Sequence, residues 1–253
     1  MMPRPMTNPA PESLFTVESM QFFGRVATDY EAMFGVRVDD LRGLHVLDCP
    51  SGPGSFVAEA NARGVRVVGV DPLYEQPLAA LVERGTNDVA YTIERMQGNA
   101  AQFADIDLHA YAESKLHALE RFAAHFETGL AQGLYVAAKL PHLPFPDGHF
   151  DLALSAHLLF TYSDPASGGL LPDSPFTLAW HMAAVRELLR VTRGEVRLYP
   201  TTTRWTTPCR HPYAEAIERD CAARGLKVRY ERSTFARGNH ANDTLNASLV
   251  IHP

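Results

Sequence analysis

The stretch from Val46 to Phe56 constrains this chain most, because its order of residue types fits few local structures. An apolar run ends in Asp48, two glycines follow at Gly52 and Gly54, and a helix-like segment rich in Ala and Glu comes next. This order predicts a strand, a tight turn and a helix N-terminus, where backbone N–H groups and the helix dipole face a ligand. The two glycines allow a sharp turn and let a ligand approach backbone that carries no Cβ.

A second acid ends the next apolar run. The segment Val65–Val70 is typical of a strand and is followed by Asp71. In a βαβ unit an acid at this position lies beside the first turn and accepts hydrogen bonds from both hydroxyls of a ribose. The nicotinamide version of the motif has a third glycine, but Val57 occupies that position here. The pattern therefore disfavours a nicotinamide oxidoreductase.

The pattern Asp-x-x-x-Gly-x-Gly resembles that of the class I S-adenosylmethionine (SAM) dependent methyltransferases. A second segment, Leu-Pro-Phe-Pro-Asp at residues 143–147, precedes Phe150 and Asp151 and a further apolar run, and it is similar to a segment common in that family. One difference lies at Pro50, where many members have glycine, since proline fixes φ and removes an N–H donor. The resemblance covers roughly residues 44–200.

The resemblance implies an α/β, Rossmann-like methyltransferase fold. Its sheet would have seven strands, mostly parallel with an antiparallel last strand, and a helical insertion before strand three. We expect one domain over residues 1–253, with an N-terminal helical arm at 1–43 and a helical insert at 86–132. Apolar residues at helical spacing over 14–35 predict one or two helices that end at Gly35. A further helix is expected to begin at Pro77 and to end before Gly85.

The resemblance also implies SAM as the cofactor and S-adenosyl-L-homocysteine (SAH) as its product. Gly52 and Gly54 would hold the methionine end, with its carboxylate at the helix start at Ser55. Asp48 would offset the amino group, and Asp71 would bind the ribose. The expected cofactor-binding positions are Asp48, Pro50, Ser51, Gly52, Gly54, Ser55, Asp71, Pro72, Leu140, His142 and Ser155.

Residues beyond the fourth strand would face the transferable methyl, because ligands bind at the carboxyl ends of parallel strands. His157 and Tyr162 are the candidate catalytic residues, as either side chain can remove a proton from an acceptor. A capping or core role for His157 is an equal alternative. Tyr30, Phe160 and Trp205 are the candidate substrate contacts, although a core position for Tyr30 is favoured.

Composition indicates a globular protein with ordinary hydrophobic content, 46%, and charged content, 21%. No apolar run reaches the length of a membrane span, so no membrane partner is expected. Three cysteines are too few and too scattered for a disulfide framework or a zinc cluster, which favours a cytoplasmic location. No metal site is expected, because His109, His117 and His125 do not share one face of a helix.

The net charge of −6 argues against a general nucleic-acid binder. Residues 193–237, however, hold 10 basic and 5 acidic side chains. The expected function is methyl transfer by in-line displacement to an unidentified acceptor, most simply a small molecule. Two alternatives stay open: an RNA methyltransferase that uses the basic 193–237 region, and a protein that binds SAM without turnover. The sequence does not indicate an oligomeric state.

Overall fold

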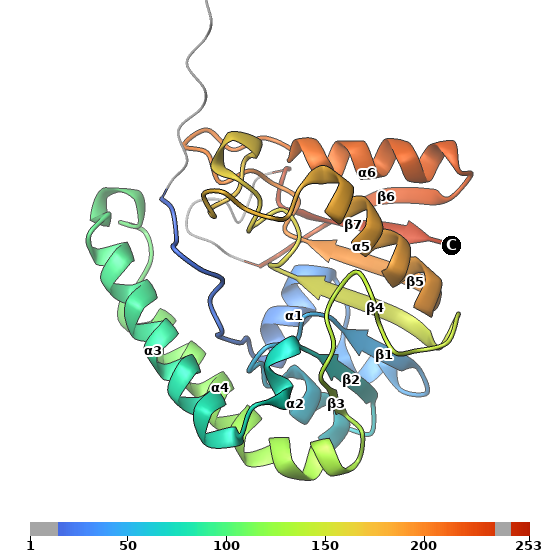
Figure 1. Cartoon of the computed structure of the whole chain (residues 1–253), viewed down its shortest axis with the longest axis horizontal. Helices are drawn as coiled ribbons and strands as arrows, with labels where there is room; N and C mark the ends of the chain where they lie inside the picture. The colour runs from blue at the N-terminus through green and yellow to red at the C-terminus, as the bar shows by residue number, and fades with distance from the viewer. Residues whose placement is uncertain (1–14, 236–243) are drawn as a thin grey trace, which may run out of the picture.

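The computed structural model describes residues 15–235 and 244–253, and in these residues seven strands form one sheet (Figure 1). The strand order is β3-β2-β1-β4-β5-β7-β6, and only β7 runs antiparallel to its neighbours. The strands are β1 (His45–Asp48), β2 (Arg66–Val70), β3 (Tyr135–Val136), β4 (Phe150–Ala156), β5 (Thr192–Tyr199), β6 (Lys227–Arg232) and β7 (Ala247–His252). The predicted sheet, with its antiparallel last strand, is confirmed.

Helices cover both faces of the sheet, as expected when successive side chains of a buried strand point to opposite sides. Val46 and Leu47 of β1 belong to two different core clusters. The first cluster packs α1, α2 and α4 against the sheet, and the second packs α5 and α6 against the other face. The helices are α1 (Ala27–Phe34), α2 (Phe56–Ala62), α3 (Leu78–Gln97), α4 (Leu108–Ala131), α5 (Leu178–Val191) and α6 (Pro212–Ala223).

The helical insertion before strand three is present, but it begins earlier than expected. The prediction that a helix ends at Gly85 was wrong, because α3 runs through this residue to Gln97. A Cβ at Gly85 would lie 3.1 Å from both methyl carbons of Leu119 on α4. The glycine therefore permits the close approach of α3 and α4, which stand as a long pair beside the sheet (Figure 1).

The N-terminal arm differs most from its prediction. Helix α1 accounts for only part of the expected helical stretch, since residues 15–26 form neither helix nor strand. We call residues 15–26 the N-terminal strap; the arm before residue 15 lies outside the described residues. The backbone of the N-terminal strap is hydrogen-bonded to distant elements. The Phe22 N–H donates to the Asp88 carboxylate at 2.7 Å, and the Val17 N–H donates to the Leu170 carbonyl at 3.0 Å. Because these partners come from different elements, the apolar residues of the strap do not form one helical face.

Candidate functional site

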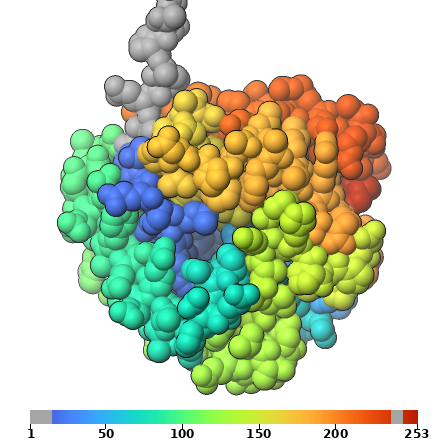
Figure 2. Space-filling view, in the orientation of Figure 1, coloured from blue at the N-terminus to red at the C-terminus, as the bar shows by residue number. Residues whose placement is uncertain are grey.

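The loops after β1, β2, β3 and β4 meet at one edge of the sheet and line a cavity of about 1470 Å³. The N-terminal strap and the start of α4 form the other walls. Figure 2 shows the opening as a hollow bordered by the strap, in blue, and by the loop after β3, in yellow-green. Typical small-molecule pockets measure ~300–1,000 Å³, so this cavity has room for more than one small ligand.

The structure brings together about half of the residues singled out from the sequence. Those lining the cavity are Tyr30, Pro50, Ser51, Gly52, Asp71, Pro72, Leu140, His157 and Tyr162. Those outside the lining are Asp48, Gly54, Ser55, His142, Ser155, Phe160 and Trp205. Apart from Tyr30 on α1, the first group follows the ends of β1, β2, β3 and β4, which is where ligands bind in open α/β sheets.

Asp48 lies beneath the cavity and is fully buried. Both of its carboxylate oxygens accept from the Tyr30 hydroxyl at 3.0 Å. The Tyr30 ring stacks on Phe56 with 4.2 Å between ring centroids, so the favoured core position of Tyr30 agrees with the structure. Burial raises the pKa of Asp48 to about 7, and the nearby charge of Asp71 acts in the same direction. This carboxylate reaches a ligand only indirectly, through Tyr30.

Asp71 stands directly in the cavity wall, at the end of β2. It is 7% exposed, and its Oδ1 accepts from the Leu73 N–H at 2.9 Å. Burial raises the pKa of Asp71 to about 6, while hydrogen bonds from the backbone of Leu73 and Gly52 favour the ionised form and oppose that shift. Because β1 and β2 are neighbouring parallel strands, Asp71 and Asp48 flank the same turn.

The two glycines of the turn serve different purposes. Gly52 has a φ of +53°, and a Cβ there would meet nothing within 4 Å, so no part of the protein blocks a ligand on that side of the residue, although its carbonyl accepts from the Tyr74 hydroxyl at 2.6 Å. Gly54, in contrast, is covered by the strap: a Cβ built on Gly24 would lie 2.2 Å from the Gly54 nitrogen. The Ser55 N–H donates to the Arg25 carbonyl at 3.0 Å. The expectation of a ligand at Gly54 and Ser55 is therefore corrected, because the strap backbone occupies that helix start.

Val57 does not prevent close packing of α2 on the sheet. A Cβ on Gly69 of β2 would lie 2.9 Å from Val57 Cγ2. The third glycine of a nucleotide fingerprint allows close helix–strand packing. Here the residue without a Cβ is Gly69 on the strand and not Val57 on the helix, so the helix can still pack closely on the strand. Val57 alone is therefore a weaker argument against a dinucleotide than the sequence indicated.

The two candidate catalytic residues occupy different settings. His157 follows β4 with a φ of +58°, which is rare for a residue with a Cβ and is often found at functional sites. Its ring packs edge-on against Tyr199 at 5.4 Å. The Tyr162 hydroxyl accepts from the strap N–H of Gln21 at 3.1 Å, and burial raises the pKa of Tyr162. A Tyr162 phenolate is thus harder to form, whereas His157 stays a candidate base.

Four other predicted positions lie away from the cavity for identifiable reasons. His142 is exposed at the surface, and Ser155 is buried within the sheet. Phe160 is fully buried, and its N–H donates to His181 Nε2 at 3.0 Å. The Trp205 indole donates to the Pro165 carbonyl at 2.9 Å. Phe160 and Trp205 were predicted from the sequence to contact the substrate. Core packing and hydrogen bonds with the backbone instead explain where these two side chains lie.

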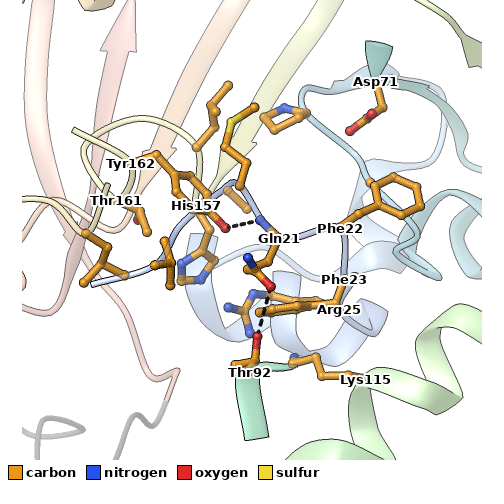
Figure 3. Close-up of a pocket in the computed structure, with 18 of the residues that line it drawn as sticks. Gln21, Phe22, Phe23, Arg25, Asp71, Thr92, Lys115, His157, Thr161 and Tyr162 are labelled. Carbon is orange, nitrogen blue, oxygen red and sulfur yellow. Dashed lines mark hydrogen bonds between the residues drawn. The ribbon is translucent and has the colours of Figure 1, made fainter. Parts of the chain in front are cut away.

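Sequence reasoning did not identify the residues of the strap, α3 and α4 that line the cavity, other than Tyr30 on the neighbouring α1. Figure 3 shows Gln21, Arg25, Thr92 and Lys115 together with His157 and Tyr162 around the interior. The amphipathic pattern over residues 14–35 signalled buried residues. It did not show which of them would face a cavity, since that depends on where α3 and α4 pack.

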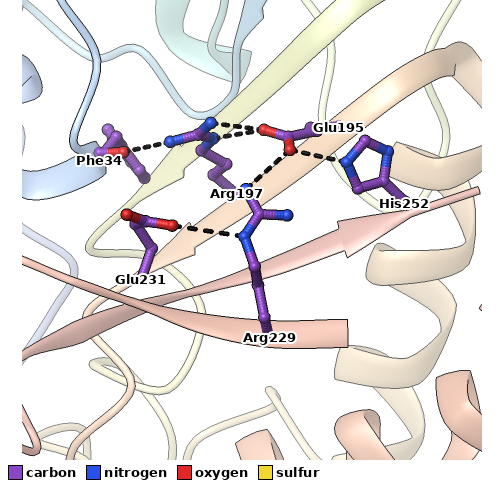
Figure 4. Close-up of polar contacts among 6 residues, drawn as sticks. All are labelled: Phe34, Glu195, Arg197, Arg229, Glu231 and His252. Atoms are coloured by element: carbon purple, nitrogen blue, oxygen red, sulfur yellow. Dashed lines mark hydrogen bonds and ion pairs between the residues drawn. The ribbon is translucent and has the colours of Figure 1, made fainter. Parts of the chain in front are cut away.

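Part of the positive charge of the basic region 193–237 is neutralised by nearby acids. Arg193 pairs with Asp151 at 2.7 Å. Arg229 pairs with Glu195 at 2.8 Å (Figure 4). The Arg197 guanidinium lies against the same Glu195. Neutralised arginines attract a phosphate backbone weakly, which makes the RNA alternative less favourable.

No group of three or more His, Cys, Asp or Glu side chains in residues 15–235 and 244–253 is placed to hold a metal ion. None of the helices in those residues is long and apolar enough to cross a membrane.

No family model matches the chain. A stretch of 90 residues is 36% identical to part of an uncharacterized methyltransferase of Mycolicibacterium vanbaalenii. This match covers 34% of this chain and 34% of that protein. The chain thus spans about a third of that relative.

Solved structures with a similar chain path share little sequence with this protein. They include 1,6-didemethyltoxoflavin-N1-methyltransferase of Burkholderia thailandensis (14% identity, TM-score 0.41, 88% of this chain and 78% of that one). Magnesium protoporphyrin IX methyltransferase of Synechocystis PCC 6803 is another (15% identity, TM-score 0.40, 84% and 70%). The strand order and the antiparallel β7 are those of the Rossmann-like methyltransferase fold that the sequence predicted.

Proposed function

We propose that this protein is a SAM-dependent methyltransferase that acts on a small-molecule acceptor. The observation that carries the proposal is the arrangement of Asp71, the open backbone of Gly52 and the buried Asp48 at the ends of two adjacent strands. The cavity is enclosed by the strap and by α4, which suits a small acceptor better than a polymer. A cytoplasmic location stays a prediction.

The lining residues fit SAM by their chemistry. Asp71 accepts from ribose hydroxyls, and the exposed backbone of Gly52 allows close approach of the chain that follows the ribose. Leu140 and Pro72 offer apolar surface to an adenine ring. Tyr30 links the site to Asp48, so the negative charge beneath the turn favours a cationic amino group above it.

When bound, SAM supplies a sulfonium methyl group that an acceptor atom attacks in line as the sulfur–carbon bond breaks. The residues of the chain contribute positioning and exclusion of water, which account for much of catalysis when no covalent enzyme intermediate is needed. His157 stays the predicted proton acceptor, because it lines the cavity at the end of β4. Tyr162 instead holds the strap in place through Gln21.

Replacing Asp71 with alanine tests the proposal directly. Charge-assisted hydrogen bonds contribute ~1.5–3 kcal/mol, so SAH affinity is expected to fall by about one to two orders of magnitude in calorimetric titration. Asp39→Ala, at a surface acid paired with Arg42, is the matched control and should bind normally. A folded Asp71→Ala protein with unchanged SAH affinity would refute the assignment. SAH formation with candidate acceptors separates an enzyme from a protein that binds SAM without turnover.

The raised pKa values of Asp48 and Asp71 predict pH-dependent binding. In the free protein both carboxyls hold their protons to higher pH than the usual 3.8, so their contribution to stability is present at low pH and is lost as the pH rises through about 6 and 7. A ligand that donates hydrogen bonds or carries an ammonium group prefers the ionised forms. Binding must therefore displace protons below these pH values.

We expect SAH affinity to be nearly constant above about pH 8, to fall by up to roughly tenfold per pH unit between about 7 and 6, and to fall by up to roughly a hundredfold per unit below about 6, where both carboxyls must lose a proton. Calorimetry in buffers of different ionisation enthalpy should show proton release on binding near pH 6. Asp71→Asn should flatten this part of the profile. Affinity that is independent of pH between 5 and 8 would contradict the role of the two acids.

A further inference from the structure

Arg25 is a positively charged residue of the cavity wall, and none of the contacts to SAM proposed above involves it. It is 6% exposed, it lines the cavity, and its guanidinium carbon lies 5.2 Å from the centre of the Phe235 ring. Figure 3 shows its side chain among the lining residues. Within residues 15–235 and 244–253, the guanidinium makes neither an ion pair nor a hydrogen bond. Burial of a charge without a partner is costly.

Two other cations of the same lining have acidic partners. Lys115 lies 3.6 Å from Asp29, and Arg84 lies 2.7 Å from Asp88. The ring of Phe235 offers Arg25 a cation–π contact, which offsets only part of the lost hydration. Unlike Lys115 and Arg84, Arg25 can therefore take its negative charge from a ligand.

The backbone of Arg25 strengthens this argument. The start of α2 is the usual anion site of a strand–turn–helix unit, but its Ser55 N–H is already bonded to the Arg25 carbonyl. The neighbouring Gly54 N–H points to the Ser51 carbonyl at 3.4 Å, and Gly24 covers that turn. An anion in this cavity therefore cannot use the helix start. The same residue that closes the helix start presents a guanidinium to the cavity.

We infer that Arg25 is the anion-binding residue of the cavity and that it holds a carboxylate. The planar guanidinium fork matches a carboxylate with two parallel hydrogen bonds. A doubly charged phosphate fits less well, because the carboxylates of Asp29 and Asp71 line the same cavity. The inference rests on the proposed function, and the carboxylate has two possible sources: the methionine part of the cofactor or an acid group of the acceptor.

The test compares wild type, Arg25→Gln and Arg25→Lys by calorimetry with three probes. The probes are SAH, decarboxylated SAH that lacks only the carboxylate, and benzoate added to protein saturated with SAH. If the cofactor is the source, Arg25→Gln weakens SAH by about 10- to 100-fold, leaves decarboxylated SAH unchanged, and Arg25→Lys recovers part of the loss. The unchanged affinity for decarboxylated SAH also shows that the variant is folded.

If the acceptor is the source, SAH affinity stays unchanged in Arg25→Gln, while benzoate binds wild type and loses at least tenfold in the variant. Arg186→Gln is the control, since Arg186 lies on the outer side of α5 with a 58% exposed side chain. Normal SAH affinity in Arg25→Gln without any Arg25-dependent benzoate binding overturns the inference. Failure of wild type to bind SAH would instead reject the proposed function, and benzoate added to the free protein would then test Arg25 alone.

Discussion

Replacing Gly24 with alanine is expected to lower the free energy of unfolding by about 3 kcal/mol and to weaken SAH binding at the same time. A Cβ at this position would lie 2.2–2.3 Å from backbone atoms of Gly54 and Pro53. Overpacking typically costs ~1–3 kcal/mol, and backbone atoms on both sides leave no flexible side chain to move. Separation of the strap from the turn also shifts the cavity wall that carries Arg25.

Urea unfolding and calorimetry measure the two effects of Gly24→Ala independently. Gly98→Ala is the matched control: this residue ends α3 with a φ of −63°, and its nearest neighbours would lie 3.6 Å from a new Cβ. The control should change stability by less than about 0.5 kcal/mol. Equal behaviour of the two variants would show that the strap does not pack on the glycine turn.

Phe122→Ala is expected to cost about 3–5 kcal/mol of stability, the usual loss for a fully buried phenylalanine. Its ring contacts Tyr74, Phe126 and Tyr135, with centroids 4.9–5.8 Å away, and so fixes α4 against the sheet. Phe22 of the strap packs on the same ring at 6.5 Å. Loss of the ring should therefore loosen two walls of the cavity together.

Leu130→Ala, on the same helix at a 43% exposed position, is the control for Phe122→Ala. It should cost less than about 0.5 kcal/mol in the same denaturation experiment. Comparable losses in the two variants would contradict the placement of α4. A loss below 1 kcal/mol in Phe122→Ala would do the same.

The central sheet was predictable because its signals are local. Strand β1 matches the predicted His45–Asp48, and β2 differs from the predicted run by one residue at its start. Both are short apolar runs bounded by turn residues, and each is followed by a chemically distinctive acid. The strand-end location of Asp71 follows from this local pattern alone.

The walls of the cavity were not predictable in the same way. Gly85 has the local appearance of a helix end, yet its function depends on Leu119, which lies far along the chain. The strap has the apolar spacing of a helix, but its backbone donors are taken by Asp88, Tyr162 and Leu170. Tertiary partners override local propensity here, and the orientation of Arg25 follows from them.

Similarly, Gly54 could be recognised as a position that needs a bare backbone, but not what would approach it. The sequence pattern is the same whether a ligand or another stretch of protein lies there. Only the packing of Gly24 against it decides the matter.

The buried carboxyl of Asp48 has a consequence for cofactor discrimination. Dinucleotides carry a pyrophosphate that would lie over this turn, directly above Asp48 and beside Asp71. With pKa values of about 6 and 7, Asp71 is mostly ionised and Asp48 is about half ionised at neutral pH, and burial leaves little water to screen them from an anion. Like-charge repulsion therefore selects against polyphosphates at this turn, independently of the side chain at position 57.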